Sequence, residues 1–201
     1  PDANIALFAH DEWTKDDPRC EDLYMVADCP NNTRAKLWAL SKTPFDKTVY
    51  LDADTFVEHE DVSKMFDFDS DLVFTNIRPY AGKIAKFIGG EMVLHGGVFG
   101  YKSTPRVLKF MKEWWQYYHN QRTGTWWPED IQPKERLVYW DQFTLWWLLE
   151  NEYSDLDISI YEDDARFNFV YIYKEDECKG PKVIYHYTLQ LKDPKDERSL
   201  S

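Results

Sequence analysis

The feature that most constrains the fold is the alternation of strand-like and helix-like segments along the chain. Runs rich in apolar, β-branched and aromatic residues predict strands at 4–8, 23–27, 48–51, 71–76, 92–102, 169–173 and 182–187. The spacing of apolar residues predicts helices at 33–41, 106–121 and 141–151. This order predicts an α/β fold with a mixed, mainly parallel sheet flanked by helices.

The composition describes a globular chain of 201 residues, with 43% hydrophobic and 17% aromatic residues and a net charge of -12. Such an acidic chain repels phosphate backbones, which excludes nucleic acid as a partner. The cysteines are odd in number and lack metal-binding spacing, so we expect reduced thiols and a cytoplasmic protein. We find no apolar run of membrane-span length and no signal-peptide pattern.

Two acidic residues, Asp52 and Asp54, directly follow the apolar run 48–51, which predicts a buried strand. Side chains two residues apart on an extended chain point to the same side, so these carboxylates repel each other unless a cation lies between them. Oxygen ligands suit Mg²⁺ and Mn²⁺, and ligands of α/β sheets bind at the carboxyl ends of strands. The pair therefore predicts a metal site, with a solvated Asp-rich turn as the alternative.

Five motifs together resemble one family. They are "RAKLWALSKTPFDKTVYLDADTFV" (34–57), "HGGVFGYKS" (95–103), "WDQ" (140–142), "RFNF" (166–169) and "IYHYT" (184–188). In this order they are similar to elements of the GT-A nucleotide-sugar glycosyltransferases, particularly the glycogenin-like and related retaining groups. The general look is also close to glycosyltransferase domains of large DNA viruses of algae, of the chlorella-virus type.

The resemblance implies a GT-A-like, Rossmann-like fold and a metal-dependent transferase. In these families an Asp-X-Asp element, here Asp52, Ala53 and Asp54, holds a divalent ion that binds the diphosphate of the donor. The matching C-terminal histidine is His186, which implies Mn²⁺ in preference to Mg²⁺ because imidazole suits the softer ion. The expected donor is a UDP-sugar, a UDP-hexose or deoxyhexose. The expected acceptor is a glycan or glycoprotein, with retention of anomeric configuration.

Three basic residues are candidates for the donor phosphates. Arg34 and Lys36 lie on the helix before the acidic pair, and Lys192 follows the strand that carries His186. The forked donors of Arg suit phosphate. For each of the three, a charged, solvated surface is the alternative.

Asp141 and Gln142 are the candidate catalytic residues. By the resemblance, this pair orients the donor sugar and stabilises an oxocarbenium-like state, whereas in an inverting enzyme Asp141 would act as the base. Asp141 would also serve as a helix N-cap. Gly96 and Gly97 would let the backbone approach the donor closely, with a β-bulge as the alternative, and His186 has a packed core histidine as its alternative.

The sequence departs from the family in two places. The region before Asp52 is short, which predicts a nucleoside-binding part that is abbreviated or partly missing, and His95 stands where Asn is usual. We expect a single domain over 1–201, with a nucleotide- and metal-binding part over about 1–76 and a sugar-binding part over about 77–190. The charged stretch 191–201 is expected to be a tail.

Tryptophans fall into two groups. Trp126 and Trp127 lie in the irregular, Pro- and Gly-containing stretch 122–136, and could form a stacking platform for an acceptor sugar or a hydrophobic anchor for the loop. Four others lie in predicted helices, where core packing is expected: Trp114, Trp115, Trp146 and Trp147.

Two other functions fit parts of the pattern. "LDADTFV" also satisfies the signature of haloacid-dehalogenase-like phosphatases, with Asp52 as nucleophile and "YEDDARF" (161–167) as a later acidic pair. That motif normally ends the first strand of its domain, whereas two predicted strands precede it here. The aromatic content also fits a non-catalytic carbohydrate-binding domain, which leaves the acidic pair unexplained. The donor sugar, the acceptor and the oligomeric state stay open at this point.

Overall fold

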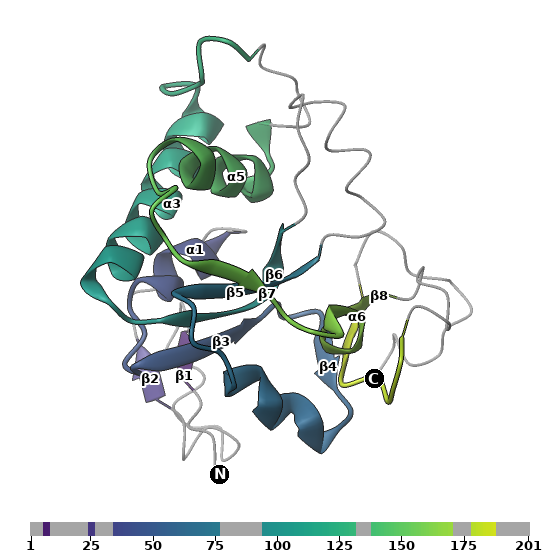
Figure 1. Cartoon of the computed structure of the whole chain (residues 1–201). Coiled ribbons are helices and arrows are strands. Elements are labelled where there is room, and N and C mark those ends of the chain that lie inside the picture. Colours follow the sequence, from purple (N-terminus) through teal and green to yellow (C-terminus); the bar gives the residue numbers. More distant parts are fainter. Residues whose placement is uncertain are drawn as a thin grey trace. The chain divides into compact units, whose positions relative to one another are not determined.

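The computed structural model describes residues 34–76, 94–131, 138–170 and 178–187, together with the backbone of two short strands, 6–8 and 24–26. Figure 1 shows the elements along the chain and labels most of them. The chain forms two compact units, each made of two separated stretches. We call residues 1–48 with 101–157 the first unit, and residues 49–100 with 158–201 the second unit.

The first unit contains a strand pair and three helices. Strand β1 (Ala6–Phe8) pairs in parallel with β2 (Tyr24–Val26). The helices are α1 (Ala35–Leu40), α3 (Pro105–Thr123) and α5 (Asp141–Asn151), each within about two residues of its predicted bounds. Helix α3 packs against both α1 and α5, and α3 and α5 lie side by side in Figure 1.

Helix α3 shows why its segment folds as predicted. The side chain of Thr104 caps the first turn by accepting a hydrogen bond from Val107 N, and Pro105 occupies the first turn. The helix ends at Gly124, whose φ of 73° is the left-handed conformation that glycine adopts easily. The predicted apolar face is buried as expected: Val107, Phe110, Met111, Trp114 and Tyr118.

The main sheet has four strands in the order β3-β6-β5-β7. These are β3 (Lys47–Leu51), β5 (Leu72–Asn76), β6 (Leu94–Lys102) and β7 (Ile158–Ile160). The boundaries between the units fall within β3 and β6. The prediction that 48–51 is a buried strand was wrong, since every residue of β3 is half-buried. The physical reason is its place at one end of the strand order, whereas β5 and β6 lie inside it.

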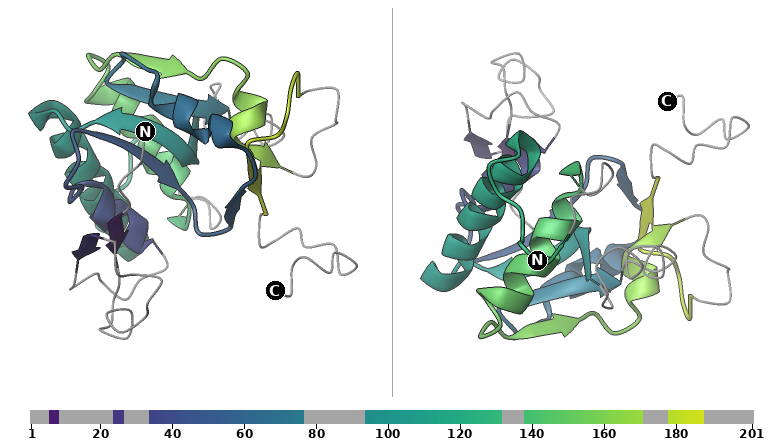
Figure 2. Two further views of the ribbon diagram at one scale, coloured as in Figure 1. Left: turned by 90° about the horizontal axis from the view of Figure 1, so that it is seen from below. Right: turned by 90° about the horizontal axis from the view of Figure 1, so that it is seen from above.

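A second, smaller sheet belongs to the second unit. Strand β9 (Ile184–His186) pairs antiparallel with β4 (Thr55–Val57) and parallel with β8 (Phe169–Val170). In Figure 2 the yellow strand β9 lies beside the green strand β8. The sequence did not predict β4 or β7, because three residues are too few to show a period.

Two short helical segments complete the second unit: the 3-10 helix η3 (Glu60–Phe66) and α6 (Asp164–Phe167). The carboxylate of Asp164 accepts a hydrogen bond of 2.8 Å from Asn76 N, which attaches α6 to the end of β5. The guanidinium of Arg166 pairs with Asp61 at 2.5 Å, which attaches α6 to η3. The two segments are thereby fixed around a core of Met65, Val73, Val98, Phe167 and Ile184.

The observed elements confirm the predicted mixed α/β fold. The pairs β1–β2, β5–β7 and β8–β9 are parallel, while β4–β9 is antiparallel. Within the part of the chain that the structure describes, no helix combines the length and the apolar character needed to cross a membrane.

Candidate metal centre

A tight turn after β3 positions Asp52 and Asp54. The backbone N–H of Asp52 donates to Gly97 O at 2.7 Å, which holds the end of β3 against β6. Thr55 then closes the turn, since both its backbone N–H (3.1 Å) and its hydroxyl (2.7 Å) donate to Asp52 O. The turn leaves Ala53 exposed between two half-buried carboxylates.

Strand pairing brings His186 to the same turn. In the β4–β9 register, His186 lies opposite Thr55, and Tyr187 N donates to Asp54 O at 2.8 Å. The imidazole Nε2 lies 3.2 Å from Asp54 Oδ1 and 4.0 Å from Asp52 Oδ2. The structure therefore joins the acidic pair to a histidine from the far end of the sequence.

The three side chains fit a divalent cation. One donor atom from each of Asp52, Asp54 and His186 lies within 4.8 Å of the others. Two carboxylate oxygens and one imidazole nitrogen suit Mn²⁺ and similar ions, and carboxylates that converge like this repel each other without a cation. His186 is only 4% exposed, so its ring is held by the protein and not by solvent. We call this group the Asp-Asp-His cluster.

The space in front of the cluster depends on Gly97. A Cβ atom on this glycine would lie only 2.5 Å from Asp52 Oδ2. It would also lie 2.6 Å from His95 Cε1 and 2.9 Å from His186 Cε1. A side chain at this position would therefore fill the space in which the donor atoms converge. The sequence predicted that glycine here lets the backbone approach the donor closely, and in the structure its close neighbours are Asp52, His95 and His186.

Side chains that the sequence analysis missed support the cluster. The hydroxyl of Tyr50 donates to Asp52 Oδ1 at 2.7 Å, and Asn168 Oδ1 lies 2.8 Å from His186 Nδ1. The ring of His95 stands edge-on to that of His186, with centroids 5.2 Å apart. The period of a strand could have indicated Tyr50, which is two residues before Asp52 and on the same side.

The other candidate carboxylate, Asp141, lies in the first unit. It is 4% exposed and pairs with Lys36 Nζ at 3.3 Å and with Arg34 Nε at 3.6 Å. Burial by itself would raise the pKa of this carboxyl, but the charges of Lys36 and Arg34 outweigh burial and hold the pKa below its usual value. Asp141 is therefore ionised at neutral pH.

The local structure around Asp141 differs from the expected cap. The N-cap of α5 is Trp140, and Asp141 is the first residue of the helix, so the N-cap interpretation was wrong by one position. Asp141 Oδ1 instead accepts a hydrogen bond from Gln142 N at 3.1 Å, while Asp141 O accepts one from Trp114 Nε1 at 3.0 Å. Buried and anchored at both its backbone and its carboxylate, Asp141 is held in one orientation.

The other predicted site residues lie in different parts of the fold. Gly96 is buried in β6, Gln142 is half-buried at the start of α5, and Lys192 lies outside the described residues. Arg34 and Lys36 were predicted to meet phosphates, and the structure pairs both with Asp141.

The loop tryptophans pack against helices of the first unit. The Trp126 ring contacts Tyr117 and Trp147, with centroids 4.9 and 5.0 Å away, and Trp127 stacks on Phe143 at 4.8 Å. These contacts favour the anchoring role over a platform for an acceptor sugar. Of the helical tryptophans, Trp114 is fully buried, whereas the other three are half-buried.

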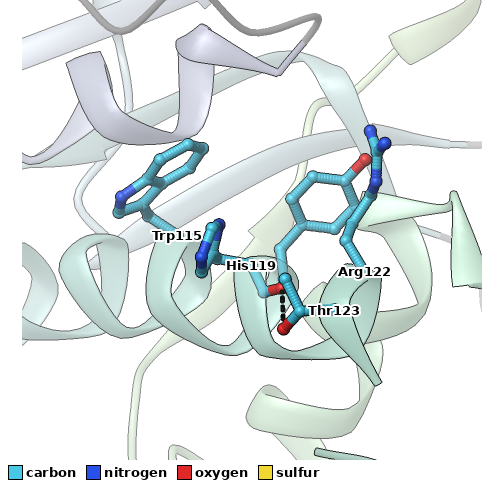
Figure 3. A pocket seen from close by; sticks show the side chains of 5 residues that line it. Trp115, His119, Arg122 and Thr123 are labelled. Carbon is cyan, nitrogen blue, oxygen red and sulfur yellow. Dashed lines mark hydrogen bonds between the residues drawn. The ribbon is translucent and has the colours of Figure 1, made fainter. Parts of the chain in front are cut away.

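A shallow pocket of about 160 Å³ lies on one face of α3 (Figure 3). Its walls are Trp115, Tyr118, His119, Arg122 and Thr123. The Thr123 hydroxyl donates to the His119 carbonyl of its own helix, and the Arg122 guanidinium lies over the Tyr139 ring. The Thr123 and Arg122 side chains of this pocket thus contact the helix itself and Tyr139, and the pocket contains none of the predicted site residues.

The chain was compared with known proteins. No protein-family model matches it, and no curated protein matches it. Solved structures of the glycosyltransferase GlyE from Streptococcus pneumoniae TIGR4 are similar to it, one with a TM-score of 0.58 at 17% identity and the apo form with 0.56 at 16%. Each match covers 93% of this chain but only 48% and 47% of the GlyE chains, so this chain spans about half their length.

A structure of the galactosyltransferase LgtC, in complex with donor and acceptor sugar analogues, has a TM-score of 0.46 at 17% identity. That match covers 83% of this chain and 66% of the LgtC chain, and it is too weak to carry an argument. The GlyE structures show that the chain has a fold found in glycosyltransferases.

The acidic stretch 161–167, considered for the phosphatase alternative, makes other contacts or is exposed. Asp164 is buried and bonded to the backbone of Asn76, while Glu162 and Asp163 are exposed. Among the described residues, the donor atoms that lie close to Asp52 belong to Asp54 and His186, and none comes from this stretch. The structure therefore offers no support for a second acidic pair beside Asp52.

Proposed function

We propose that the protein is a metal-dependent glycosyltransferase that moves a sugar from a nucleoside diphosphate sugar to a glycan or glycoprotein. The observation that carries the proposal is the convergence of Asp52, Asp54 and His186. A likeness in fold to glycosyltransferases supports it. The carbohydrate-binding alternative gives no reason for such a cluster.

In this proposal Asp52, Asp54 and His186 hold Mn²⁺, with Mg²⁺ as a weaker substitute. The bound ion supplies positive charge to the diphosphate as the sugar–phosphate bond breaks. Tyr50 fixes Asp52 by donating to one carboxylate oxygen, so that the other oxygen faces His186. The turn closed by Thr55 keeps Asp52 and Asp54 on one side of the chain.

Residues of the first unit have separate proposed roles. Asp141 and Gln142 contact the donor sugar, and the burial of Asp141 supplies a carboxylate of fixed orientation for that purpose. Lys36 and Arg34 keep Asp141 ionised, in addition to the phosphate contacts first proposed for them. Lys192 is proposed as a further phosphate contact. The donor is proposed to be a UDP-hexose or deoxyhexose, transferred with retention.

The experiment that tests the proposal measures nucleotide binding and turnover without knowledge of the acceptor. UDP is titrated into the full chain by calorimetry with Mn²⁺, with Mg²⁺ and with EDTA. Release of UDP from a panel of UDP-sugars is then followed in the same conditions. We expect UDP binding that requires the metal, and slow release of UDP from one or a few sugars.

The alternatives give different results in the same assay. A phosphatase would release inorganic phosphate from p-nitrophenyl phosphate, and a carbohydrate-binding domain would bind sugar without releasing UDP or phosphate. Failure of every nucleoside diphosphate to bind in the presence of Mn²⁺ would refute the proposal.

A further inference from the structure

A series of hydrogen-bonded, buried polar side chains leads away from the Asp-Asp-His cluster into the core of the second unit. His186 Nδ1 lies 2.8 Å from Asn168 Oδ1, and Asn168 Nδ2 lies 2.9 Å from Thr75 Oγ1. Thr75 Oγ1 in turn lies 2.9 Å from Val98 O. The exposed fractions of these side chains are 4% for His186, 1% for Asn168 and 0% for Thr75, so water does not substitute for these contacts.

The donor and the acceptor of each hydrogen bond follow from the group at the end of the series, the carbonyl of Val98. A backbone carbonyl only accepts, so the single hydroxyl proton of Thr75 points to Val98 O. Thr75 Oγ1 must therefore accept from Asn168, which places the amide NH₂ of Asn168 toward Thr75. The amide oxygen of Asn168 then faces His186 and can only accept, so the proton of the imidazole lies on Nδ1.

This order of donors has a consequence for the cluster. With the proton on Nδ1, the lone pair of the neutral ring lies on Nε2, which is the nitrogen 3.2 Å from Asp54 Oδ1. A histidine binds a metal through a lone pair, and the hydrogen bond of its other nitrogen sets which lone pair is available. The core of the protein thus holds His186 in the form that a cation requires.

We infer that Thr75 and Asn168 are positioning residues of the metal centre: their hydrogen bonds fix the tautomer and the orientation of His186. The inference rests on the proposed function, since it assigns these residues to the metal site of that proposal. Neither residue lies next to the acidic pair in the sequence. They are the second-to-last residue of β5 and the C-cap residue of α6.

The test compares Thr75→Val with Thr75→Ser. Valine has the shape of threonine without the hydroxyl, so Asn168 loses its acceptor and its amide is no longer fixed in one direction. Serine keeps the hydroxyl. We expect Thr75→Val to weaken Mn²⁺ binding about 10-fold and Thr75→Ser to change it less than about twofold, as measured by calorimetry. Equal Mn²⁺ affinities in the two folded variants would overturn the inference.

A second measurement needs no metal and no variant. Long-range ¹H–¹⁵N NMR spectra of the metal-free parent protein distinguish the two nitrogens of His186 by their chemical shifts. We expect a proton on Nδ1, and a ring that carries its proton on Nε2 alone would overturn the inference. Because this readout is independent of Mn²⁺, it separates failure of the inference from failure of the proposed function.

Discussion

Two acidic regions of this protein differ in the groups that face their carboxylates. In the first unit, the carboxylate of Asp141 is buried with two cationic side chains of the protein itself, Lys36 and Arg34. In the second unit, Asp52 and Asp54 converge on His186, which brings a third donor atom for a metal. The first arrangement stabilises an ionised carboxylate within the protein, whereas the second offers three donor atoms to a cation.

The difference shows which chemistry each region can support. The lowered pKa of Asp141 keeps this carboxylate negatively charged at neutral pH, which suits contact with polar groups of a substrate or a role in stability. In the Asp-Asp-His cluster, a divalent ion bound as proposed would relieve the repulsion between the two carboxylates. Variants in each region should therefore differ in kind, with lost metal binding in one case and lost stability in the other.

The largest expected effect is that of Asp54→Asn. This change removes the carboxylate nearest to His186 and should weaken Mn²⁺ binding and slow UDP release by at least about 100-fold. The matched control is Asp67→Asn, an exposed carboxylate of the same unit. Calorimetry with Mn²⁺ measures both variants. If Asp54→Asn bound Mn²⁺ as tightly as its control, the proposed difference between a metal-binding cluster and the ion-paired Asp141 would be refuted.

The next effect compares two glycines of β6. Gly97→Ala puts a methyl group among the donor side chains and should weaken Mn²⁺ binding by roughly 10- to 100-fold. Gly100→Ala puts one against Phe68, Val73 and the Tyr161 hydroxyl in the core, and should lower the free energy of unfolding by about 1–3 kcal/mol.

The same two variants sharpen the comparison when both properties are measured. Mn²⁺ affinity by calorimetry should fall mainly for Gly97→Ala, and stability in urea mainly for Gly100→Ala. Similar losses of Mn²⁺ affinity in both would mean that the cluster responds to any disturbance of β6.

A third variant, Lys36→Met, addresses the first unit. Among the described residues it leaves the buried Asp141 with Arg34 as its ion-pair partner, and it should lower the free energy of unfolding by about 2 kcal/mol. Arg34→Met should cost less than about 1 kcal/mol, because the Arg34 side chain is 36% exposed and its ion pair is longer. Urea unfolding of both variants tests this order, and equal losses would contradict it.

The smallest expected effect concerns pH. The pKa of Asp141 is lowered by folding, so the unfolded chain binds more protons in acid than the folded chain does. The stability that this gives is present above the ordinary carboxyl pKa of 3.8 and is lost as the pH falls further. The Lys64 and Arg166 hydrogen bonds similarly lower the pKa of Asp61 to about 2.

Unfolding free energies from neutral pH down to about pH 2 test this effect in the parent and in Asp141→Asn. We expect the variant to depend less steeply on pH below 3.8, since it lacks that carboxyl. An identical acid slope in the two proteins would show that Asp141 does not contribute.

The sequence predicts the structure correctly where local periodicity carries the information. The buried face of α3, its proline at the first turn and its glycine end all follow from residues within one helix. It failed for β4 and β7, which are too short for a period, and for the burial of β3, which depends on where that strand stands in the sheet. The N-cap of α5 was misplaced by one residue, within the usual error of helix ends.

For the site, the sequence by itself determined that two carboxylates directly follow a strand, whereas the turn closed by Thr55 brings them together with His186. Family resemblance added His186, but not the strand pairing that delivers it, because β4 was not predicted. The tertiary structure alone decided that Tyr50, Thr75 and Asn168 support the cluster and that Lys36 and Arg34 face Asp141. The physical reason is that hydrogen bonds and ion pairs between distant segments depend on packing in three dimensions, which leaves no periodic trace in the chain.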